Sequence, residues 1–235
     1  MTANKQTILI TGTSSGLGQA LFDTLAQQDI SLFCISRSFA ESQERLAEER
    51  SNITLLKCDL SDPKEVSSCV KKLKKNLEHH TDIIFINNAA VIRPVGFVGT
   101  FPDGEIASAI HINLHSPMTI TNVLCGLKEC TKLTIINIST GAARIPIAGW
   151  SLYCATKAAI GMFFDVLQKQ DAPGRSIVVH HFDPGVMDTP MQAAIRNTPS
   201  AQFPRVEEFK RYKAEGTLTD PVHVAARLVK EYIRL

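Results

Sequence analysis

The 235-residue sequence lacks two features that would each define a large class of proteins. No apolar run approaches the ~18 residues that a membrane-spanning helix needs, which excludes an integral membrane protein. Neither sign of charge dominates, because 25 Lys and Arg residues accompany 23 Asp and Glu residues, for a net charge of +2. No basic face of the kind that binds a nucleic-acid backbone is evident. We therefore expect neither a membrane nor a nucleic-acid partner.

Paired cysteines and a secretory leader are also missing. The six cysteines are scattered without a C-x-x-C pair, which is atypical of a disulfide framework or a zinc site. The first six residues are polar and only four β-prone residues follow them, so the sequence has no secretory hydrophobic region. These observations predict a cytoplasmic protein without a metal centre.

Short apolar runs alternate with amphipathic helical patterns along the whole chain. In 62–77, for example, apolar residues recur at helical spacing while four lysines fall on the other face. Continuous apolar runs predict strands that are buried on both faces of a parallel sheet. The six predicted strands are 7–10, 31–36, 53–57, 82–86, 133–138 and 176–182. We predict one α/β domain over residues 1–235, a doubly wound parallel sheet with helices on both faces.

One segment interrupts this alternation. Residues 189–216 follow the sixth predicted strand, are largely polar and contain three prolines. Insertions at the carboxyl end of a parallel sheet lie over the ligand crevice. Because the apolar Met191, Ile195 and Phe203 within it need a surface to cover, we predict a substrate lid. An ordinary surface excursion is the alternative.

A glycine-rich turn joins the first predicted strand to the helical pattern 19–28. Gly12, Gly16 and Gly18 follow the spacing G-x-x-x-G-x-G. Glycines at such a turn permit a tight bend and a close approach of the backbone to a pyrophosphate. The N–H groups at the start of the helix attract the anion. The position between a strand and a helix favours a dinucleotide-binding turn over a purely structural one.

The end of the second predicted strand distinguishes the two nicotinamide cofactors. A carboxylate at this place would bind a ribose 2′-hydroxyl, but the chain has Ser36, Arg37 and Ser38 instead. The planar guanidinium of Arg37 suits a 2′-phosphate, and the flanking hydroxyls add hydrogen-bond donors. We expect NADP(H) in preference to NAD(H), and a solvent-facing arginine is the alternative.

Tyr153 and Lys157 stand four residues apart at the start of the helical pattern 151–170, so both side chains lie on one helix face. A neighbouring ammonium favours the phenolate and lowers the pKa of a phenol from its ordinary value of about 10. Tyr153 would then protonate a carbonyl oxygen as a hydride arrives.

Three more polar residues complete the predicted catalytic group. The hydroxyls of Ser139 and Thr140, at the end of the fifth predicted strand, are placed to hydrogen-bond to the same oxygen and orient it. Asn113, within the helical run 110–127, is expected to hold a water that replaces the proton. On its own Asn113 would read as an ordinary polar residue of a helix.

Taken in order, these motifs resemble those of the short-chain dehydrogenase/reductases across nearly the whole chain. The series consists of the glycine turn, N-N-A-A at 87–90, Asn113, Ser139 with Thr140, and Tyr153-x-x-x-Lys157. The stretch D-P-G-V-M-D-T at 183–189 is similar to the proline-glycine loop of the family. The resemblance implies a Rossmann fold, an NAD(P) cofactor and Tyr153 as the acid/base. It also implies that Lys157 bridges the nicotinamide ribose and the tyrosine.

The resemblance extends these assignments to a complete cofactor site. It implies that the proline-glycine loop holds the nicotinamide carboxamide and that Asp59 and Leu60 lie near the adenine. The predicted cofactor-binding residues are Gly12, Ser14, Ser15, Gly16, Leu17, Gly18, Ser36, Arg37, Asp59, Leu60, Asn88, Ala89, Ala90, Asn113, Tyr153, Lys157, Pro184, Gly185, Val186, Met187 and Thr189. Within the family, the stretches 137–154 and 184–192 are most similar to the benzil reductases that form (S)-benzoin, with sepiapterin reductases as neighbours.

The sequence departs from the family pattern at three places. Thr140 stands where the family usually has its catalytic serine, so the role of that hydroxyl falls to Thr140 or Ser139. The glycine that often closes the N-N-A-G motif is Ala90. No residue matches the C-terminal aspartate with which sepiapterin reductases anchor the pterin, and this weakens the pterin interpretation.

Apolar residues from several segments are expected to meet at the crevice and to suit an aromatic or bulky ketone or diketone. They are Val91, Ile92, Pro94, Phe97, Ile145, Pro146, Trp150, Met187, Met191 and Phe203. The predicted substrate residues are Thr140, Trp150, Tyr153, Met187 and Met191. We predict an NADPH-dependent carbonyl reductase that converts a benzil-like diketone to the hydroxy compound, with Tyr153 as general acid. A sepiapterin- or pteridine-type reductase and a non-catalytic NADPH-sensing protein are the alternatives.

The resemblance also bears on assembly. Members of the family commonly associate through the helices that correspond to those containing Asn113 and Tyr153. By resemblance alone we therefore expect a homodimer or homotetramer, with a small-molecule carbonyl compound as the other partner.

Overall fold

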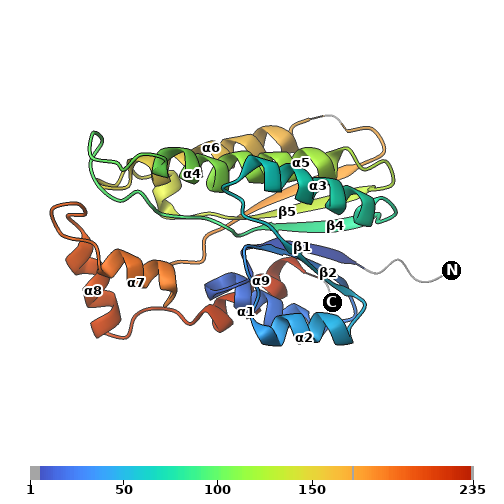
Figure 1. Ribbon diagram of the computed structural model, residues 1–235, viewed down its shortest axis with the longest axis horizontal. Coiled ribbons are helices and arrows are strands. Elements are labelled where there is room, and N and C mark those ends of the chain that lie inside the picture. The colour runs from blue at the N-terminus through green and yellow to red at the C-terminus, as the bar shows by residue number, and fades with distance from the viewer. Residues whose placement is uncertain (1–5, 171, 234–235) are drawn as a thin grey trace.

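The computed structural model describes residues 6–170 and 172–233, and its described residues form one six-stranded parallel sheet (Figure 1). The strands are β1 Thr7–Thr11, β2 Ser31–Ser36, β3 Ile53–Lys57, β4 Asp82–Asn87, β5 Lys132–Ile138 and β6 Ser176–Phe182. Their order is β3-β2-β1-β4-β5-β6, so the winding reverses between β1 and β4. The doubly wound parallel sheet is confirmed, and each predicted strand lies within one residue of its observed bounds.

Helices cover both faces of the sheet. The helical elements are α1 Gly16–Leu25, α2 Glu41–Glu49, α3 Pro63–Leu77, α4 Glu105–Ile110, the π-helical η1 His111–His115, α5 Ser116–Cys125, the 3₁₀-helical η2 Gly141–Ala143, α6 Ser151–Gln168, α7 Pro190–Arg196, α8 Val206–Ala214 and α9 Pro221–Tyr232. In Figure 1, α3, α4, α5 and α6 lie on one face, and α1, α2 and α9 lie on the other. No helix within the described ranges is both long and apolar enough to cross a membrane.

Two apolar layers hold the helices on the sheet. Leu9 belongs to the layer that also contains residues of α3, α5 and α6, whereas Ile8 and Ile10 belong to the layer that contains residues of α1 and α9. Successive residues of one strand thus enter opposite layers, as the pleat requires. The interior positions of the central strands β1 and β4 are therefore all apolar, which explains why the sequence shows continuous apolar runs instead of alternation.

The helix predicted over 110–127 is interrupted. Residues 111–115 form a π-helical turn between α4 and α5, and α5 ends at Cys125. In a regular α-helix the N–H of residue 117 would donate to the carbonyl of Asn113, but Pro117 has no N–H to donate. The wider turn accommodates this missing hydrogen bond.

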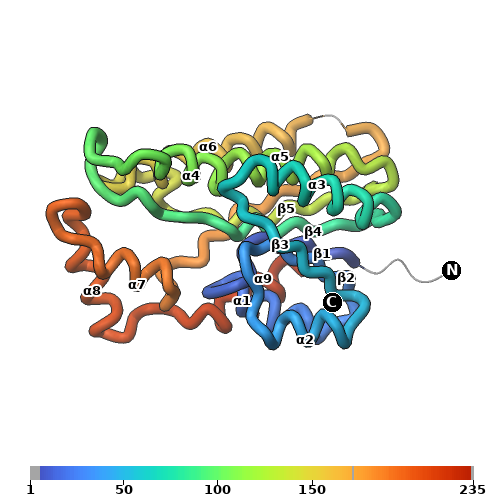
Figure 2. The backbone as a smooth tube through the Cα atoms, in the orientation of Figure 1, coloured from blue at the N-terminus to red at the C-terminus, as the bar shows by residue number. Residues whose placement is uncertain are grey.

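The segment 189–216 contains two helices, α7 and α8, which the sequence analysis did not predict. Figure 2 shows both of them, in orange to red, beyond the carboxyl ends of the strands. Their buried residues Ile195, Val206 and Phe209 form a third apolar cluster with Phe203 and Trp150. The apolar residues of the segment thus contact the body of the protein, next to the start of α6.

A row of side-chain hydrogen bonds crosses three adjacent strands near their carboxyl ends. Asn87, Asn137 and His181 are register partners on β4, β5 and β6. Nδ2 of Asn87 donates to Oδ1 of Asn137 at 2.9 Å, and Nδ2 of Asn137 donates to Nδ1 of His181 at 3.1 Å. Nε2 of His181 lies 3.0 Å from Oδ1 of Asp165 on α6. The row aligns the strand ends that lead into the loops described below.

Replacing Asn137 with leucine should destabilise the protein by about 2–3 kcal/mol, because a side chain of similar volume would leave the buried amide of Asn87 unpaired and remove the hydrogen bond to the more exposed His181. Urea denaturation followed by circular dichroism measures the loss. Ile136→Val, which removes one buried methyl group from the neighbouring position, should lose only about 1 kcal/mol. Equal losses in the two variants would contradict a structural role for the row.

Candidate active site

A cavity of about 340 Å³ lies at the carboxyl ends of the strands. It is lined by the turn after β1, the ends of β2 and β5, the loops after β3, β4 and β6, and side chains of α6, α7 and α8. All predicted cofactor and substrate residues contribute to its wall except Gly18 and Asn113. The topology therefore brings together residues that are more than 170 positions apart in the sequence, from Gly12 to Met191.

The glycine turn presents the start of α1 to this cavity. Gly12 has a left-handed φ of 75°, and Asn88 fixes the turn to the end of β4 by donating Nδ2 to the carbonyls of Thr11 at 2.9 Å and Gly12 at 3.0 Å. Ser15 occupies the N-cap of α1 without capping it through its side chain. The first-turn N–H groups of α1 thus lack a side-chain partner, and a phosphate group can take that place.

Gly18 has a packing role that differs from the predicted one. It does not line the cavity, and a Cβ atom at this position would lie 1.9 Å from the carbonyl oxygen of Gly12. The absence of a side chain allows α1 to pack directly against the turn. Gly18 therefore shapes the glycine turn without lining the cavity itself.

Ser36 and Arg37, at the end of β2, have separate surroundings. The buried Oγ of Ser36 accepts a hydrogen bond from the backbone N–H of Thr13 at 2.7 Å and so braces the glycine turn. Arg37 is exposed at the cavity and lies near Asp59. Burial acts to raise the pKa of Asp59, but hydrogen bonds from Ser61 and the charge of Arg37 outweigh it and lower the pKa. Arg37 is thus the cationic group available at this end of the cavity.

Lys157 is one of the most deeply buried charged residues of the site, with 5% of its surface exposed. Its Nζ donates to the backbone carbonyl of Ile138, the last residue of β5, at 2.8 Å. Burial lowers the pKa of Lys157 to about 8, because an ammonium loses hydration inside the protein. Lys157 is therefore still mostly protonated at neutral pH but loses its charge in mildly alkaline solution.

Tyr153 differs from the expectation that an ammonium lowers its pKa. The pKa of Tyr153 is raised to about 12, mainly by burial and to a smaller extent by the nearby Asp183 and Cys154, while a hydrogen bond with the Thr140 side chain acts to lower it. Lys157 Nζ lies 6.0 Å from the centre of the tyrosine ring and is bound to Ile138. Desolvation therefore dominates at this position, and Tyr153 is held as a protonated phenol.

The two candidate hydroxyls are not equivalent. Ser139 and Thr140 both line the cavity at the end of β5. The Thr140 side chain is the hydrogen-bond partner of Tyr153, and Thr140 also caps the short helix η2 by accepting from the N–H of Ala142 at 3.3 Å. The surroundings favour Thr140 over Ser139 as the hydroxyl that acts with Tyr153.

The Asn113 side chain does not reach the cavity wall. Its Oδ1 accepts from the N–H of Val91 at 2.8 Å, and its Nδ2 donates to the carbonyl of Val91 at 2.8 Å and to Oγ1 of Thr156 at 3.1 Å. The amide therefore clamps the loop after β4 to α6. Both hydrogens of Nδ2 are donated within the protein. A group of Asn113 other than Nδ2 would therefore have to bind the predicted water.

The predicted apolar wall is partly correct. Val91, Ile92, Trp150, Met187 and Met191 line the cavity. The other five predicted members, Pro94, Phe97, Ile145, Pro146 and Phe203, do not line it, and Phe97 and Ile145 are exposed. These residues lie in loops or behind the wall, which their sequence neighbourhood alone does not reveal.

Several residues of the wall were not predicted. They are Ile35, Cys58, Ile112, Ile138, Pro190, Gln192, Ile195 and Phe209. Ile35, Cys58 and Ile138 adjoin predicted residues at strand ends, so their positions in the sequence could have identified them as wall residues. Phe209 comes from α8 and carried no local signal. No cluster of three or more His, Cys, Asp or Glu side chains that suits a metal ion occurs in the part of the chain that the structure describes.

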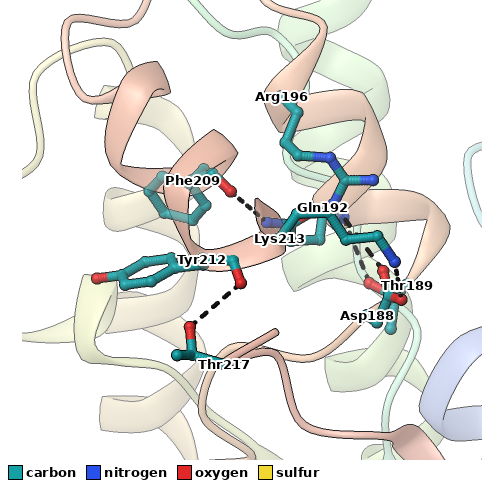
Figure 3. A network of polar contacts seen from close by, with 8 residues as sticks. All are labelled: Asp188, Thr189, Gln192, Arg196, Phe209, Tyr212, Lys213 and Thr217. Carbon is teal, nitrogen blue, oxygen red and sulfur yellow. Dashed lines mark hydrogen bonds and ion pairs between the residues drawn. The ribbon is translucent and has the colours of Figure 1, made fainter. Parts of the chain in front are cut away.

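The segment that carries α7 and α8 is fixed at its base by backbone and charge contacts. The N–H of Thr219 donates to the carbonyl of Val186 at 3.0 Å, and the N–H of Asp188 donates to the carbonyl of Thr219 at 3.0 Å. Figure 3 shows Asp188 between two cations, with Lys213 Nζ at 2.6 Å and Arg196 NH1 at 3.9 Å. The two ends of the segment thus meet beside the cavity.

Comparison with known proteins gives consistent results. A family model described as short chain dehydrogenase matches residues 6–200. A benzil reductase ((S)-benzoin forming) of Bacillus cereus is 33% identical over 224 residues, which cover 93% of this chain and 90% of the relative. A sepiapterin reductase of Mus musculus is 30% identical over 229 residues, which cover 90% of this chain and 85% of the relative. The crystal structure of the KRED1-Pglu enzyme shares the fold, with a TM-score of 0.80 and 22% identity over 97% of this chain and 95% of that chain.

The buried ammonium of Lys157 predicts a pH dependence of stability. The pKa of this lysine is about 8 in the folded protein and 10.5 as its ordinary value, so the unfolded chain binds more protons between these pH values. The free energy of unfolding should therefore rise from pH 7 to pH 10, by about 2–3 kcal/mol more in the wild type than in Lys157→Met. Urea denaturation of both proteins at pH 7, 8, 9 and 10 measures this difference, and parallel curves would contradict the burial of a charged lysine.

Proposed function

Because this chain belongs to the short-chain dehydrogenase family, whose members are NAD(P)-dependent oxidoreductases acting on carbonyl or hydroxyl groups, we propose that it reduces an aromatic or bulky ketone or diketone with NADPH. The observation that carries this proposal is the protonated phenol of Tyr153, which lies beside Thr140 in a largely apolar cavity wall. The similarity to benzil reductases supports a benzil-like diketone as the substrate.

The residues present suit a dinucleotide. The uncapped start of α1 offers backbone N–H groups to a pyrophosphate, and Arg37 offers a guanidinium to a 2′-phosphate. Pro184, Gly185 and Val186 line the cavity after β6, where the nicotinamide would be held. When bound, the reduced nicotinamide supplies a hydride to the carbonyl carbon.

The protein's own contribution is to orient the carbonyl and to provide the proton. Thr140 donates a hydrogen bond to the carbonyl oxygen, and Tyr153 gives its phenolic proton to the same oxygen as negative charge develops there. The phenolate that remains is stabilised by the positive charge of Lys157, which follows one turn later on α6. The apolar wall excludes water and strengthens these interactions.

The segment 189–216 acts as the substrate lid in this proposal. Its residues Met191, Ile195 and Phe209 line the cavity, and its helices α7 and α8 lie beyond the strand ends (Figure 2). The single domain of residues 1–235 and a cytoplasmic location are parts of the same proposal.

A homodimer or homotetramer is supported by an exposed apolar surface. Ile106 and Ile110 on α4 and Met162 and Val166 on α6 are large apolar residues that remain exposed. Helices α4 and α6 contact one another, so these exposed apolar residues belong to neighbouring helices. Exposed apolar patches of this kind are typical of association surfaces.

Tyr153→Phe should lower kcat for benzil or 1-phenyl-1,2-propanedione by at least about 100-fold, because it removes the proton donor and retains the ring. NADPH oxidation at 340 nm measures the rate, and fluorescence titration should show that NADPH still binds. Tyr232→Phe, a matched change on α9 away from the cavity wall, should leave the rate unchanged. Cofactor binding without turnover of any carbonyl compound by the wild type would favour the NADPH-sensing alternative.

Arg37→Ala should raise the KM for NADPH at least about tenfold and change the KM for NADH little, because only NADPH carries the phosphate that the guanidinium would pair with. Steady-state kinetics with each cofactor at saturating diketone measures both constants. Lys71→Ala removes an exposed cation of α3 outside the cavity wall and should alter neither constant. An equal loss for both cofactors in Arg37→Ala would contradict the assignment.

A further inference from the structure

Two polar atoms of cavity-lining residues have no hydrogen-bond partner among the described residues. They are Nε1 of Trp150, a donor, and Oε1 of Gln192, an acceptor. Both residues are deeply buried, with 5% and 3% of their surface exposed. Burial removes a polar group's hydrogen bonds to water, so a buried group left without a replacement is unfavourable and uncommon. Both residues line the cavity, and a ligand there is the natural source of the missing partners.

The surroundings of Trp150 hold its ring in place. The indole stacks on Phe203 with 4.6 Å between ring centres and an angle of 6° between the planes. The ring also makes edge contacts with Phe209 at 5.4 Å and with Tyr153 at 5.8 Å. Because three aromatic rings pack against it, the indole cannot turn freely to find an acceptor elsewhere.

The amide of Gln192 is fixed as well. Its Nε2 donates to the backbone carbonyl of Phe209 at 3.0 Å, as Figure 3 shows. The backbone of the same residue is held at the start of α7, since its N–H donates to Oγ1 of the N-cap residue Thr189 at 3.3 Å. With Nε2 engaged in this way, Oε1 is the part of the amide that remains to bind a donor.

The two unpaired atoms belong to one region of the cavity. Trp150 and Gln192 both contact Phe209, the former through its ring and the latter through its side-chain amide. Trp150 also contacts Tyr153, the proposed proton donor. A donor and an acceptor are therefore available near the place where the reacting carbonyl would lie.

On the basis of the proposed function, we infer that Trp150 and Gln192 bind a second oxygen on the carbon next to the reacting carbonyl. The indole N–H donates to this oxygen whether it is a carbonyl or a hydroxyl, whereas Oε1 of Gln192 accepts only from a hydroxyl. The substrate class is then 1,2-diketones and α-hydroxyketones, and α-hydroxyketones satisfy both residues. Neither atom is open to water, so a substrate oxygen that bonds to them meets no competition from solvent.

The chemistry is the same for both substrates. NADPH would supply the hydride that forms a C–H bond at the carbonyl carbon as the C=O π bond breaks. The oxygen of the same carbonyl would take the proton of Tyr153. NADPH is oxidised to NADP⁺ and Tyr153 regains a proton from solvent. A 1,2-diketone gives an α-hydroxyketone, and an α-hydroxyketone gives a vicinal diol.

Four matched ketones test this inference. They are propiophenone, 1-phenyl-1,2-propanedione, 2-hydroxypropiophenone and 2-methoxypropiophenone, the last of which has an oxygen acceptor but no O–H donor. For each protein we take the ratio of kcat/KM between two ketones, and we then compare this ratio between the variant and the wild type. The comparison cancels the intrinsic reactivity of the ketones. A purely structural change would lower all four values and leave these ratios unchanged.

Each residue has its own expected signature. Trp150→Phe should lower the preference for the dione and the hydroxyketone over propiophenone by roughly 3- to 10-fold, the effect of losing one hydrogen bond. Gln192→Met should lower the preference for the hydroxyketone over the methoxyketone by a similar factor and leave the dione preference unchanged. Val206→Ala, which removes buried apolar atoms from the same cluster but leaves the rings around Trp150 in place and removes no polar atom, is the control and should change no ratio.

Two results would overturn the inference, and they are distinguishable. If the wild type reduces the ketones but both variants keep its ratios within twofold, Trp150 and Gln192 only pack the cavity wall and the proposed function stands. If the wild type reduces none of the four ketones with NADPH or NADH, the proposed function fails as well. The wild-type preference for the hydroxyketone over the methoxyketone tests the Gln192 contact even if a variant does not fold, and its absence would also count against that contact.

Discussion

The hydrogen bond from Nζ of Lys157 to the carbonyl of Ile138 connects the helix that carries Tyr153 to the strand that leads into Ser139 and Thr140. This contact sets the distance between the phenol and the hydroxyls on which the rest of the site depends. It places an ammonium where water cannot reach it, and the fall in the lysine pKa reflects that burial. The site thus combines a cation that is mostly retained at neutral pH but lost in mildly alkaline solution with a phenol that keeps its proton.

Most of the fold could be predicted because burial on both faces leaves a simple trace in the sequence. Strands such as β1 and β4 are apolar at every position between their end residues, and α3 places its apolar residues on one side. The π-helical turn at 111–115 and helices α7 and α8 were missed for a different reason. Short helices are stabilised by tertiary contacts, here with Trp150, more than by their own residue pattern.

The site could be predicted where a residue type and its position on the sheet were both distinctive. The glycine turn, Arg37 and the Tyr153–Lys157 pair are of this kind, and all of them border the cavity except Gly18. The direction in which the pKa of Tyr153 is shifted could not be predicted, because the shift depends on how completely the surrounding chain removes water. Gln192 was likewise not recognised, since an unpaired amide oxygen is visible only when every neighbour is known.

The backbone contacts among Val186, Asp188 and Thr219 join the beginning and end of the segment that carries α7 and α8 and contributes to the cavity wall. An excursion whose two ends are tied together can change in length with only a small entropic penalty, since closure entropy grows slowly with the number of residues. The part of the fold that contains the glycine turn and Arg37 is then unaffected by such changes. The segment can therefore be exchanged as a unit during evolution. Such an exchange would change the range of substrates while the sheet and the glycine turn stay the same.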